Sequence, residues 1–364
     1  MKIRRFCASD FRNIETCDIR FSDGVNMLLG ENAQGKTNAV EGIYLFARGK
    51  SFRSASDRDM TRFGREGYRL FAEYEDKTGV STLEYTYYNK ALQRKKNGVK
   101  LAGAAEMMGH FRAVLFTPDH LELVKAGPEE RRGFLNVAIA QVYPEYLRYY
   151  ARYQKALENR NCLLKFAQSG RFVDERELLA WSGSLASYAS YVWMYRRDYA
   201  QKLQQYAAPV LREISEGREE LTLTYRCDIG EQERERAVAE EEYRRLLSDA
   251  TERERAAGVT LFGVHRDELE IAVNGKPARL FASQGQQRSI VLSLKMAEGE
   301  VSRQIGGEYP VYLFDDVLSE LDEGRRHFMT EHIGPGQMIL TGCETVTGNS
   351  AVHTVAVKGG HFSG

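Results

Sequence analysis

The sequence predicts an α/β protein in which a lobe of mixed β-sheet is joined to a helical lid lobe. Strand-like segments fill the first part of the chain, from Lys2 to Leu29 and from about Tyr68 to Tyr88. From roughly Pro128 to Ala256 the composition changes to long, charged helices, and strand-like runs return after it. The run that ends at Leu29 leads directly into a glycine-rich motif typical of a strand–loop–helix unit. These three observations together favour one sheet lobe interrupted by a helical insert.

The composition limits the classes of protein to which the chain can belong. It has 364 residues, 43% hydrophobic and 28% charged, enough to bury a sizeable core. Its longest apolar runs are too short to span a bilayer and its basic start leads into polar residues, so we expect a cytoplasmic protein with no membrane contact. Basic and acidic residues balance at 51 each, so any DNA surface must be local. The five scattered cysteines form no C-x-x-C pair, and we expect reduced, mostly buried thiols.

The predicted elements follow one another along the chain. Two strands, "KIRRFCAS" and "DIRFSDGVNMLLG", come first, and "YRLFAEYED" and "STLEYTYYN" are typical of antiparallel meander strands. The pair Asn97-Gly98 predicts a two-residue hairpin turn. The helical segment contains one strand-like run, "ELTLTYRCDIG", and no heptad long enough for a coiled coil. The strand-like runs "VTLFGV", "LEIAVNGKPARLF" and "YPVYLFDD" follow, with one apolar-periodic helix before the last.

The glycine-rich motif is the strongest chemical signal in the chain. Gly30 and Gly35-Lys36-Thr37 match G-x-x-x-x-G-K-[ST] completely, between an apolar strand and an amphipathic helix. Glycines let the backbone close around a phosphate, which then faces the N–H groups of a helix N-terminus. Lys36 would reach the β- and γ-phosphate oxygens, and Thr37 would supply a hydroxyl to Mg²⁺. The motif therefore predicts a site for ATP and Mg²⁺.

Two acidic residues follow another buried strand. Val311 to Phe314 are apolar or aromatic and lead into Asp315 and Asp316, as in a strand buried on both faces with acids at its carboxyl end. We expect Asp315 to hold Mg²⁺ through water and Asp316 to orient or deprotonate the attacking water. The alternative is a helix-capping acid beside a surface acid.

A polar stretch, Ser283 to Gln287, begins the apolar-periodic helix far from the phosphate loop. A hydroxyl, a glycine and amides at a helix N-terminus suit an anion. Because the chain has one nucleotide loop, this second anion site is best explained if it caps the γ-phosphate held by another copy of the protein. The alternative is ordinary serine capping, with glycine for close packing.

These motifs together resemble a known family. Ser283 to Gln286 stands where ABC-type ATPases carry their Ser-Gly-Gly-Gln/Glu signature, and nearly the whole chain resembles the RecF family of DNA repair ATPases. The resemblance is carried by "FRNIETCDIRFSDGVNMLLGENAQGKTNAVEGIYLFARGKSFR", "LFTPDHLELVKAGPEERRGFLN", "GVHRDELEIAVNGKPARLFASQGQQRSIVLSLKMAE" and "YPVYLFDDVLSELDEGRR". It implies a P-loop NTPase of the ABC/SMC-head type, with a short helical lid in place of a long coiled coil. Residues 1–127 would begin the ATPase lobe, 128–256 would form the lid, and 257–364 would carry the signature helix and return to the ATPase lobe.

The resemblance also implies roles for individual residues. Asp315 and Asp316 correspond to the metal-binding acid and the catalytic acid, and because ABC proteins usually have Glu at the second place, we expect slow hydrolysis. Ser319 to Asp322 matches a loop that crosses a dimer interface, and Thr341 stands where transporter ATPases carry a switch histidine. The residues expected around the nucleotide are Arg12, Gly30, Glu31, Asn32, Ala33, Gln34, Gly35, Lys36, Thr37 and Asn38 of one chain and Ser283, Gln284, Gly285 and Gln286 of the other.

Three segments depart from the family pattern. Asn32-Ala33-Gln34 stands where the phosphate loop usually has Asn-Gly or Asn-Gly-Gln, a change expected to be conservative because neither position carries a turn glycine. Gly263 to Asp267 reads Gly-Val-His-Arg-Asp where Gly-Pro-His-Arg-Asp is frequent. The tail that follows "LTGCE" diverges most.

The resemblance implies an ATP-dependent homodimer that binds double-stranded and gapped DNA and helps load RecA together with RecR and RecO. Each ATP would lie between one phosphate loop and the partner's Ser283 helix, so weak, DNA-stimulated hydrolysis would favour separation. A groove across the dimer would contact DNA phosphates without reading sequence. The candidate contacts are Arg94, Lys95, Lys96, Arg131 and Arg132, although such charges are usually a solvated surface.

Two other functions remain open. An ATPase subunit of a membrane transporter is disfavoured by the missing switch histidine, the large helical lid and the neutral tail. A scaffold that binds nucleotide without hydrolysing it stays open because Asp316 stands in place of Glu. A nuclease is disfavoured, because the sequence offers no further cluster of His and acidic residues with metal-ligand spacing.

Overall fold

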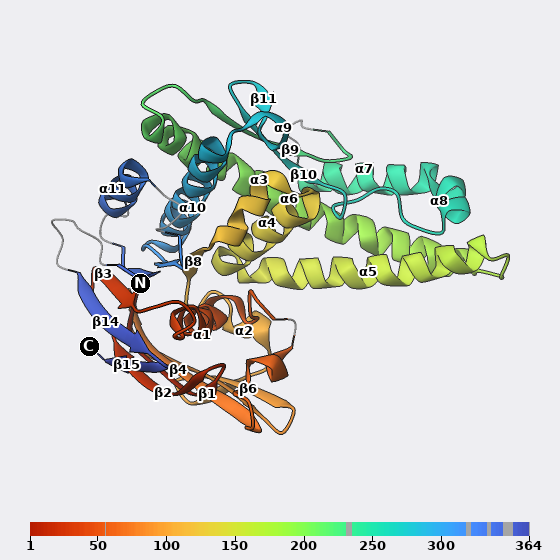
Figure 1. The fold of residues 1–364 in the computed structure, drawn as a ribbon. Coiled ribbons are helices and arrows are strands. Elements are labelled where there is room, and N and C mark those ends of the chain that lie inside the picture. Colours follow the sequence, from red (N-terminus) through yellow and green to blue (C-terminus); the bar gives the residue numbers. More distant parts are fainter. Residues whose placement is uncertain (55, 231–234, 318–321, 333–335, 345–351, 364) are drawn as a thin grey trace.

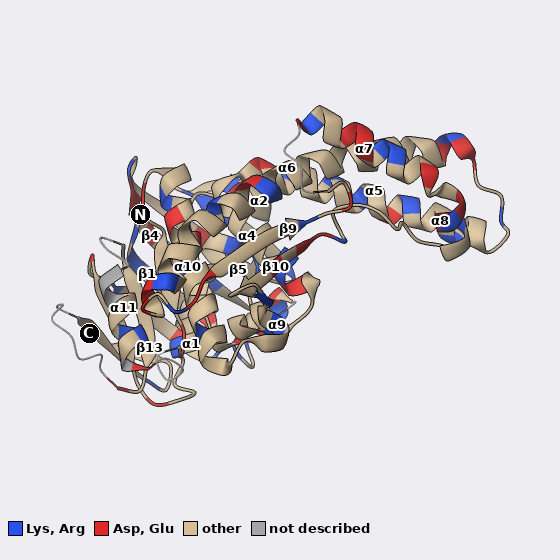
Figure 2. Cartoon of the chain, turned by 90° about the horizontal axis from the view of Figure 1, so that it is seen from above, with Lys and Arg blue, Asp and Glu red and all other residues tan. Residues whose placement is uncertain are grey.

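The chain forms a sheet lobe and a helical lobe (Figure 1), and its two hydrophobic cores meet at a parallel sheet whose alternate residues, such as Leu313 and Phe314, belong to different cores. The computed structural model describes residues 1–364 except 55, 231–234, 318–321, 333–335, 345–351 and 364. The large sheets lie in the lower part of Figure 1, and a helical arm extends to the right above them. Basic and acidic residues are interspersed along both lobes (Figure 2). No helix in the described part of the chain is long and apolar enough to cross a membrane.

The sheet lobe contains two six-stranded sheets. The first is antiparallel, with the order β2-β1-β4-β5-β6-β7; the second has the order β15-β14-β3-β13-β12-β8 and is parallel except for β15. The strands are β1 (Lys2–Phe11), β2 (Ile14–Arg20), β3 (Val25–Leu29), β4 (Gly67–Asp76), β5 (Gly79–Tyr88), β6 (Ala91–Lys96), β7 (Val99–Leu101), β8 (Ala113–Phe116), β12 (Val311–Phe314), β13 (Met338–Gly342), β14 (His353–Lys358) and β15 (His361–Ser363). The helical elements of this part are α1 (Lys36–Arg48), η1 (Asp57–Met60), α2 (Ala104–Met107), η2 (Pro118–Leu121), α3 (Glu122–Lys125) and α11 (Glu323–His332).

Helix α1 is buried in the core of the sheet lobe. This core joins residues of the antiparallel sheet, such as Phe6, to residues of the parallel sheet, such as Leu28 and Leu313, and to Ile43 of α1. Gly42 allows the close approach of α1 to β1, because a Cβ at this position would lie 2.6 Å from the ring of Phe6. This packing fixes the helix whose first two residues, Lys36 and Thr37, end the phosphate-loop motif.

The helical lobe forms the arm and the base to which it is attached. Its elements are α4 (Pro128–Val142), α5 (Pro144–Gln168), α6 (Glu175–Ile214), β9 (Leu221–Arg226), α7 (Arg236–Asp249), α8 (Thr251–Ala257), β10 (Glu268–Val273), β11 (Lys276–Pro277), α9 (Ala278–Phe281) and α10 (Gln284–Gly306). Helix α6 packs against both α5 and α7, and in Figure 1 α7 runs along the upper side of the arm and α5 along its lower side.

A buried ion pair joins α5 to α8 within the arm. Arg160 and Glu254 are both fully buried, and their charged atoms lie 2.6 Å apart. The guanidinium of Arg160 also donates to the hydroxyls of Ser182 and Thr260, each at 2.9 Å. Breaking such a pair typically costs about 3–5 kcal/mol because one charge would remain buried without compensation. The pair therefore holds the helices of the arm in one arrangement.

Most of the predicted elements are confirmed, including the meander β4–β5, strand β9 and the β6–β7 hairpin. In that hairpin Asn97 and Gly98 have φ angles of 48° and 80°, as a two-residue turn with positive φ requires. The segment "DIRFSDGVNMLLG" was predicted as one strand, which is wrong: it forms β2 and β3, separated by a turn whose Ser22 donates its N–H to the Asn26 side chain.

The predicted strand "VTLFGV" is also wrong. The backbone N–H of Thr260 donates to the Asn161 side chain, and that of Leu261 donates to the carboxylate of Glu254. Side chains of the arm therefore take the hydrogen bonds that a neighbouring strand would have made, and this segment is irregular.

Candidate functional site

The phosphate loop follows β3, which lies between β13 and β14 in the parallel sheet. Gly35 has a φ of 115°, which favours glycine, and it ends the loop without a side chain that could cap α1. The first N–H groups of α1 therefore have no capping side chain and can face an anion. Gly30 is required for close packing, because a Cβ there would lie 2.2 Å from the carbonyl oxygen of Val357 in β14.

Ala33 corrects one expectation about the loop. Its φ is 63°, a left-handed conformation that disfavours an L-residue by about 1 kcal/mol relative to glycine. The prediction that neither departing position carries a turn glycine is therefore wrong at Ala33. The side chain of Asn13 donates to the Ala33 carbonyl oxygen at 3.4 Å, so the β1–β2 turn supports the loop at this residue.

The remaining predicted loop residues lie together around the start of α1. The ammonium group of Lys36 donates to the carbonyl oxygens of Gly30 and Glu31, and its side chain is buried. The Gln34 side chain accepts the N–H of Gly359 at 2.6 Å, which ties the loop to the β14–β15 turn. Asn38 donates to the side chain of Asn13 at 2.7 Å. Sequence reasoning did not single out Asn13, although it directly follows the predicted Arg12.

The two predicted metal residues meet directly. The Thr37 hydroxyl donates to Oδ1 of Asp315 at 3.0 Å, which joins the start of α1 to the end of β12. Oxygen ligands of Mg²⁺ lie about 2.1 Å from the ion in octahedral geometry, so adjacent ligands are about 3 Å apart. A hydroxyl and a carboxylate at this separation fit a Mg²⁺ site. Burial raises the pKa of Asp315, whereas the hydrogen bonds from Thr341 and Thr37 lower it.

Thr341 has a role that the sequence did not reveal. Its hydroxyl donates to Oδ1 of Asp315 at 2.9 Å and accepts the backbone N–H of Asp316 at 2.9 Å. Asp316 has a φ of 56°, a left-handed conformation that Asp adopts more readily than most residues. Thr341 at the end of β13 therefore fixes both acids, and Asp316 is presented at an exposed position.

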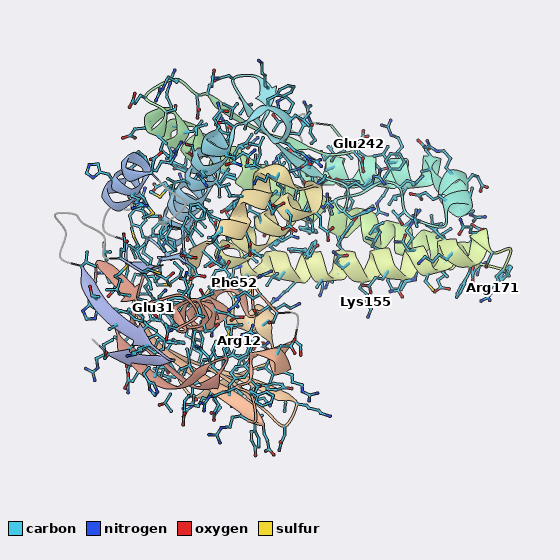
Figure 3. All side chains as sticks on the ribbon, viewed as in Figure 1. Arg12, Glu31, Phe52, Lys155, Arg171 and Glu242 are labelled. Atoms are coloured by element: carbon cyan, nitrogen blue, oxygen red, sulfur yellow. The ribbon has the colours of Figure 1, made fainter. Side chains whose placement is uncertain are left out.

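Arg12 lies beside the loop but is held by its own chain. Its guanidinium makes two hydrogen bonds to the fully buried carboxylate of Glu41 in α1, at 3.0 and 2.6 Å. Arg12, Asn13, Asn38 and Arg53 line one side of an open hollow of about 850 Å³. Figure 3 shows Arg12 and Glu31 on the sheet lobe near α1. The predicted position of Arg12 is thus next to the phosphate loop, with Glu41 setting its orientation.

The predicted second anion site lies on the helical lobe. The Ser283 hydroxyl accepts the N–H of Gln286 at 3.3 Å, and the Gln286 side chain accepts the N–H of Ser283 at 2.8 Å. This capping box confirms the serine-capping part of the alternative, but it leaves the Ser283 O–H free to donate elsewhere. Ser283 and Gln284 are exposed, and among the described hydrogen bonds none joins them to the phosphate loop of the same chain.

Gly285 is not explained by packing within the chain. Glycine in a helix costs up to about 1 kcal/mol relative to alanine. A Cβ at Gly285 would meet only Arg325, at an ordinary contact distance of 3.5 Å, and the residue does not have a positive φ. The small residue is therefore not required by its own chain, whereas the close approach of an external group would require it.

The DNA-contact candidates are mostly engaged inside the protein. Arg131, considered as a DNA contact or a surface charge, is neither: it is buried and makes two hydrogen bonds of 2.7 Å to Glu268. Arg132 donates to the Asp267 carbonyl oxygen at 2.8 Å. In the hairpin, Arg94 stacks over the Tyr85 ring, and Lys96 lies 3.1 Å from His110. Lys95 remains the one hairpin candidate with no such described contact.

Two further expectations have different outcomes. In the matched segment Ser319 to Asp322, the first three residues lie outside the described part of the chain, so only Asp322 can be placed.

All five cysteines are free, as expected, but the prediction that they are mostly buried is wrong, because three are half-buried and Cys162 and Cys343 are exposed.

Cys343 provides a direct test of the loop as a nucleotide site. Its sulfur lies 3.8 Å from Nζ of Lys36 and 3.2 Å from the side chain of Asn32. We expect ATP with Mg²⁺ to slow the labelling of Cys343 by a maleimide at least about tenfold, because the phosphates would cover the thiol. Mass spectrometry after timed labelling measures both exposed cysteines, and Cys162 on the arm is the internal control. Equal rates at Cys343 with and without ATP would contradict a nucleotide at this loop.

Comparison with known proteins identifies relatives over almost the whole chain. A family model described as the RecF/RecN/SMC N terminal domain matches residues 2–359. A DNA replication and repair protein RecF from Geobacillus kaustophilus is 37% identical over 334 residues, covering 92% of this chain and 90% of that protein. One from Clostridioides difficile is 35% identical over 345 residues, covering 94% of this chain and 92% of that protein.

Solved structures agree with the fold. The structure of the recombination mediator protein RecF-ATPrS in the RecFOR pathway has a TM-score of 0.92 and 30% identity, covering all of this chain and 97% of that one. An SMC head bound to the C-winged helix domain of ScpA has a TM-score of 0.56 at 15% identity, covering all of this chain and 97% of that one, which supports the fold alone. The chain therefore belongs to the RecF family of DNA replication and repair proteins, with the fold of ABC/SMC-type ATPase heads.

Proposed function

We propose that this protein is an ATP-dependent DNA-binding ATPase of recombinational repair and replication-gap processing, and that ATP joins two copies head to head. The observation that carries the proposal is that two helix starts suited to an anion, those of α1 and α10, lie on different parts of the chain. The phosphate loop and the Thr37–Asp315 pair lie on the sheet lobe, whereas the exposed Ser283 terminus lies on the helical lobe. Solved relatives described with ATP in the RecFOR pathway support this assignment.

Within one chain, the sheet lobe would bind the nucleotide. Lys36 and the uncapped N–H groups of α1 would bind the phosphates, and Thr37 and Asp315 would hold Mg²⁺. When bound, Mg²⁺ neutralises phosphate charge. Asp316 would orient the attacking water or accept its proton. Its side chain is one methylene shorter than Glu, so hydrolysis would be weak, and a non-hydrolysing scaffold is the second candidate that this residue favours.

The partner chain would complete the site. In a two-fold symmetric dimer, each Ser283 terminus would face the partner's phosphate loop, and its N–H groups and hydroxyl would donate to the γ-phosphate. Gly285 would then permit the close approach that its own chain does not explain. Loss of the γ-phosphate would remove these contacts and favour separation, which couples hydrolysis to release of DNA. Because solved relatives are described as acting in the RecFOR pathway, we expect RecR and RecO to be the protein partners. Together they would help to load RecA onto DNA.

One helix face offers charges for DNA phosphates. Arg148, Arg152 and Lys155 are exposed on α5, and their spacing of four and three residues places them on one face. None of the three forms an ion pair with a described acidic residue. Figure 3 shows Lys155 pointing away from the arm toward the open space below it. This face would supplement the hairpin residue Lys95 in salt-dependent contacts with duplex DNA.

Light scattering with and without ATP and Mg²⁺ tests the proposed dimer. The Asp316→Asn variant should retain ATP and accumulate as a dimer that binds duplex DNA, because the catalytic acid is lost but both binding surfaces remain. The same chain with Ser283→Arg should bind ATP and stay monomeric, since the arginine would obstruct the partner's γ-phosphate site. Equal molar masses for the two variants in ATP would show that Ser283 only caps its helix.

The α5 face is tested by charge removal. The triple variant Arg148→Ala, Arg152→Ala and Lys155→Ala should bind duplex DNA about tenfold or more weakly in ATP, because three phosphate contacts are lost. The dependence of log affinity on log salt should also fall in slope by up to about 3. Fluorescence anisotropy with a labelled duplex over a salt series measures both quantities.

A matched triple variant provides the control. Arg244→Ala, Arg245→Ala and Arg253→Ala removes the same charge from α7 and α8, on the other side of the arm. This variant should bind DNA almost as the parent does. Equal losses in both triple variants would assign the effect to net charge rather than to the α5 face.

A further inference from the structure

Arg325 contacts the first turn of the signature helix from another element. Its Nε donates to the Ser289 hydroxyl at 2.9 Å, and its Nη2 donates to the carbonyl oxygen of Gly285 at 3.1 Å. The two acceptors lie four residues apart on α10, so one guanidinium spans a full turn of this helix. Gly285, one of the two acceptors, directly follows the exposed Ser283 and Gln284 in the sequence.

The same arginine is anchored to the segment that follows the two acids. Asp322 accepts the N–H of Arg325 at 2.9 Å, which caps α11, and it also forms an ion pair with the Arg325 side chain. Asp322 lies six positions after Asp316 in the sequence. Arg325 therefore joins the start of α11 to the first turn of α10, the helix terminus that would face a partner.

The electrostatics argue against a purely structural role. A cation near the N-terminus of a helix opposes the helix dipole and destabilises that helix by about 0.3–1 kcal/mol. Arg325 occupies this unfavourable position beside α10, where Asp322 compensates part of its charge. The same positive charge would be favourable if the helix terminus faces an anion. The arrangement thus fits a helix that presents itself to a phosphate.

We propose that Arg325 is a positioning residue that holds the Gly285–Ser289 turn in the orientation required to cap the γ-phosphate bound by a second copy of this chain. This inference rests on the proposed ATP-dependent dimer. It adds the residue that aligns the start of α10, through which each chain would contact the ATP of its partner. Because Arg325 contacts neither the phosphate loop nor the acids directly among the described hydrogen bonds, its loss should weaken dimer formation without changing the affinity of one chain for ATP.

The test uses full-length protein in the Asp316→Asn background, with ATP and Mg²⁺. Light scattering over a concentration series measures the concentration of half-dimerisation, and binding of a fluorescent ATP analogue to monomers measures nucleotide affinity. Arg325→Ala should raise the half-dimerisation concentration about tenfold or more, since charge-assisted hydrogen bonds are lost. Its nucleotide affinity should stay within about twofold of the background. A general loss of structure would instead weaken both dimerisation and nucleotide binding.

Ser289→Ala keeps the positive charge of Arg325 and removes the hydroxyl that accepts its hydrogen bond. This variant therefore tests the contact between α11 and α10 even if Arg325→Ala folds poorly. It should weaken dimerisation in the same direction, and the double variant should be no worse than Arg325→Ala alone because both changes break one contact. Ser293→Ala is the matched control: it lies one turn later on α10, is fully buried, and bonds back to the Ser289 carbonyl oxygen. This control should dimerise like the background.

The outcomes separate this inference from the proposed function. If Asp316→Asn fails to dimerise in ATP, or if Ser283→Arg does not prevent dimerisation, the trans site itself is wrong. If Ser283→Arg abolishes dimerisation while Arg325→Ala and Ser289→Ala dimerise at the background concentration, only the role of Arg325 is overturned. If the losses in dimerisation caused by Arg325→Ala and Ser289→Ala add fully in the double variant, the role of Arg325 is overturned as well.

Discussion

The carboxylate of Asp315 is the interaction on which the arrangement of the site depends. One oxygen of this carboxylate accepts hydrogen bonds from Thr37 at the start of α1 and from Thr341 at the end of β13. Three separate segments of the chain therefore meet at one buried atom. Desolvation disfavours the charged acid, and the two hydroxyls offset part of this cost. A Mg²⁺ ion beside the carboxylate would favour the charged form further.

In the proposed dimer, a complete site requires a surface that this chain places elsewhere. The packing of α1 between the sheets fixes the phosphate loop, and the capping box fixes the start of α10 on the other lobe. Both termini leave N–H groups available to an anion, but the fold keeps them on different lobes. Two-fold symmetry provides a simple way to bring such surfaces together twice in one assembly. The nucleotide would then be part of the interface, and its γ-phosphate would determine whether the interface persists.

The sequence predicted the parts of the site that depend on local patterns. The phosphate-loop motif, the buried strand before Asp315 and the helix that begins at Ser283 each have a spacing or periodicity with a physical reason, and each is found where expected. The hydroxyl of Thr341 could not be predicted, because its role arises from the pairing of β12 with β13, which are not defined by a motif. The link from Arg325 to Gly285 joins residues 40 positions apart and has no sequence signature.

Errors in the predictions came from tertiary contacts that override local patterns. Ala33 was considered a conservative change, but the β1–β2 turn holds it in a left-handed conformation that only the folded loop reveals. The segment around Thr260 has the composition of a strand, yet side chains of the arm take its backbone hydrogen bonds. Arg131 was considered a candidate DNA contact or a surface charge, but its side chain is buried and pairs with Glu268 of β10.

The central claim, that two chains share each ATP site, is tested most directly by mixing two defective variants. Lys36→Ala removes the phosphate-loop lysine, and Ser283→Arg blocks the partner's site, so each variant alone should turn over ATP very slowly. In a mixture, only a dimer with one chain of each kind contains a complete site, formed by the intact loop of the Ser283→Arg chain and the intact Ser283 of the Lys36→Ala chain. Hydrolysis should therefore return on mixing, up to about half of the wild-type rate because one site of two is complete. Wild-type hydrolysis by the Ser283→Arg variant alone would contradict the claim, because the site would then be complete within a single chain.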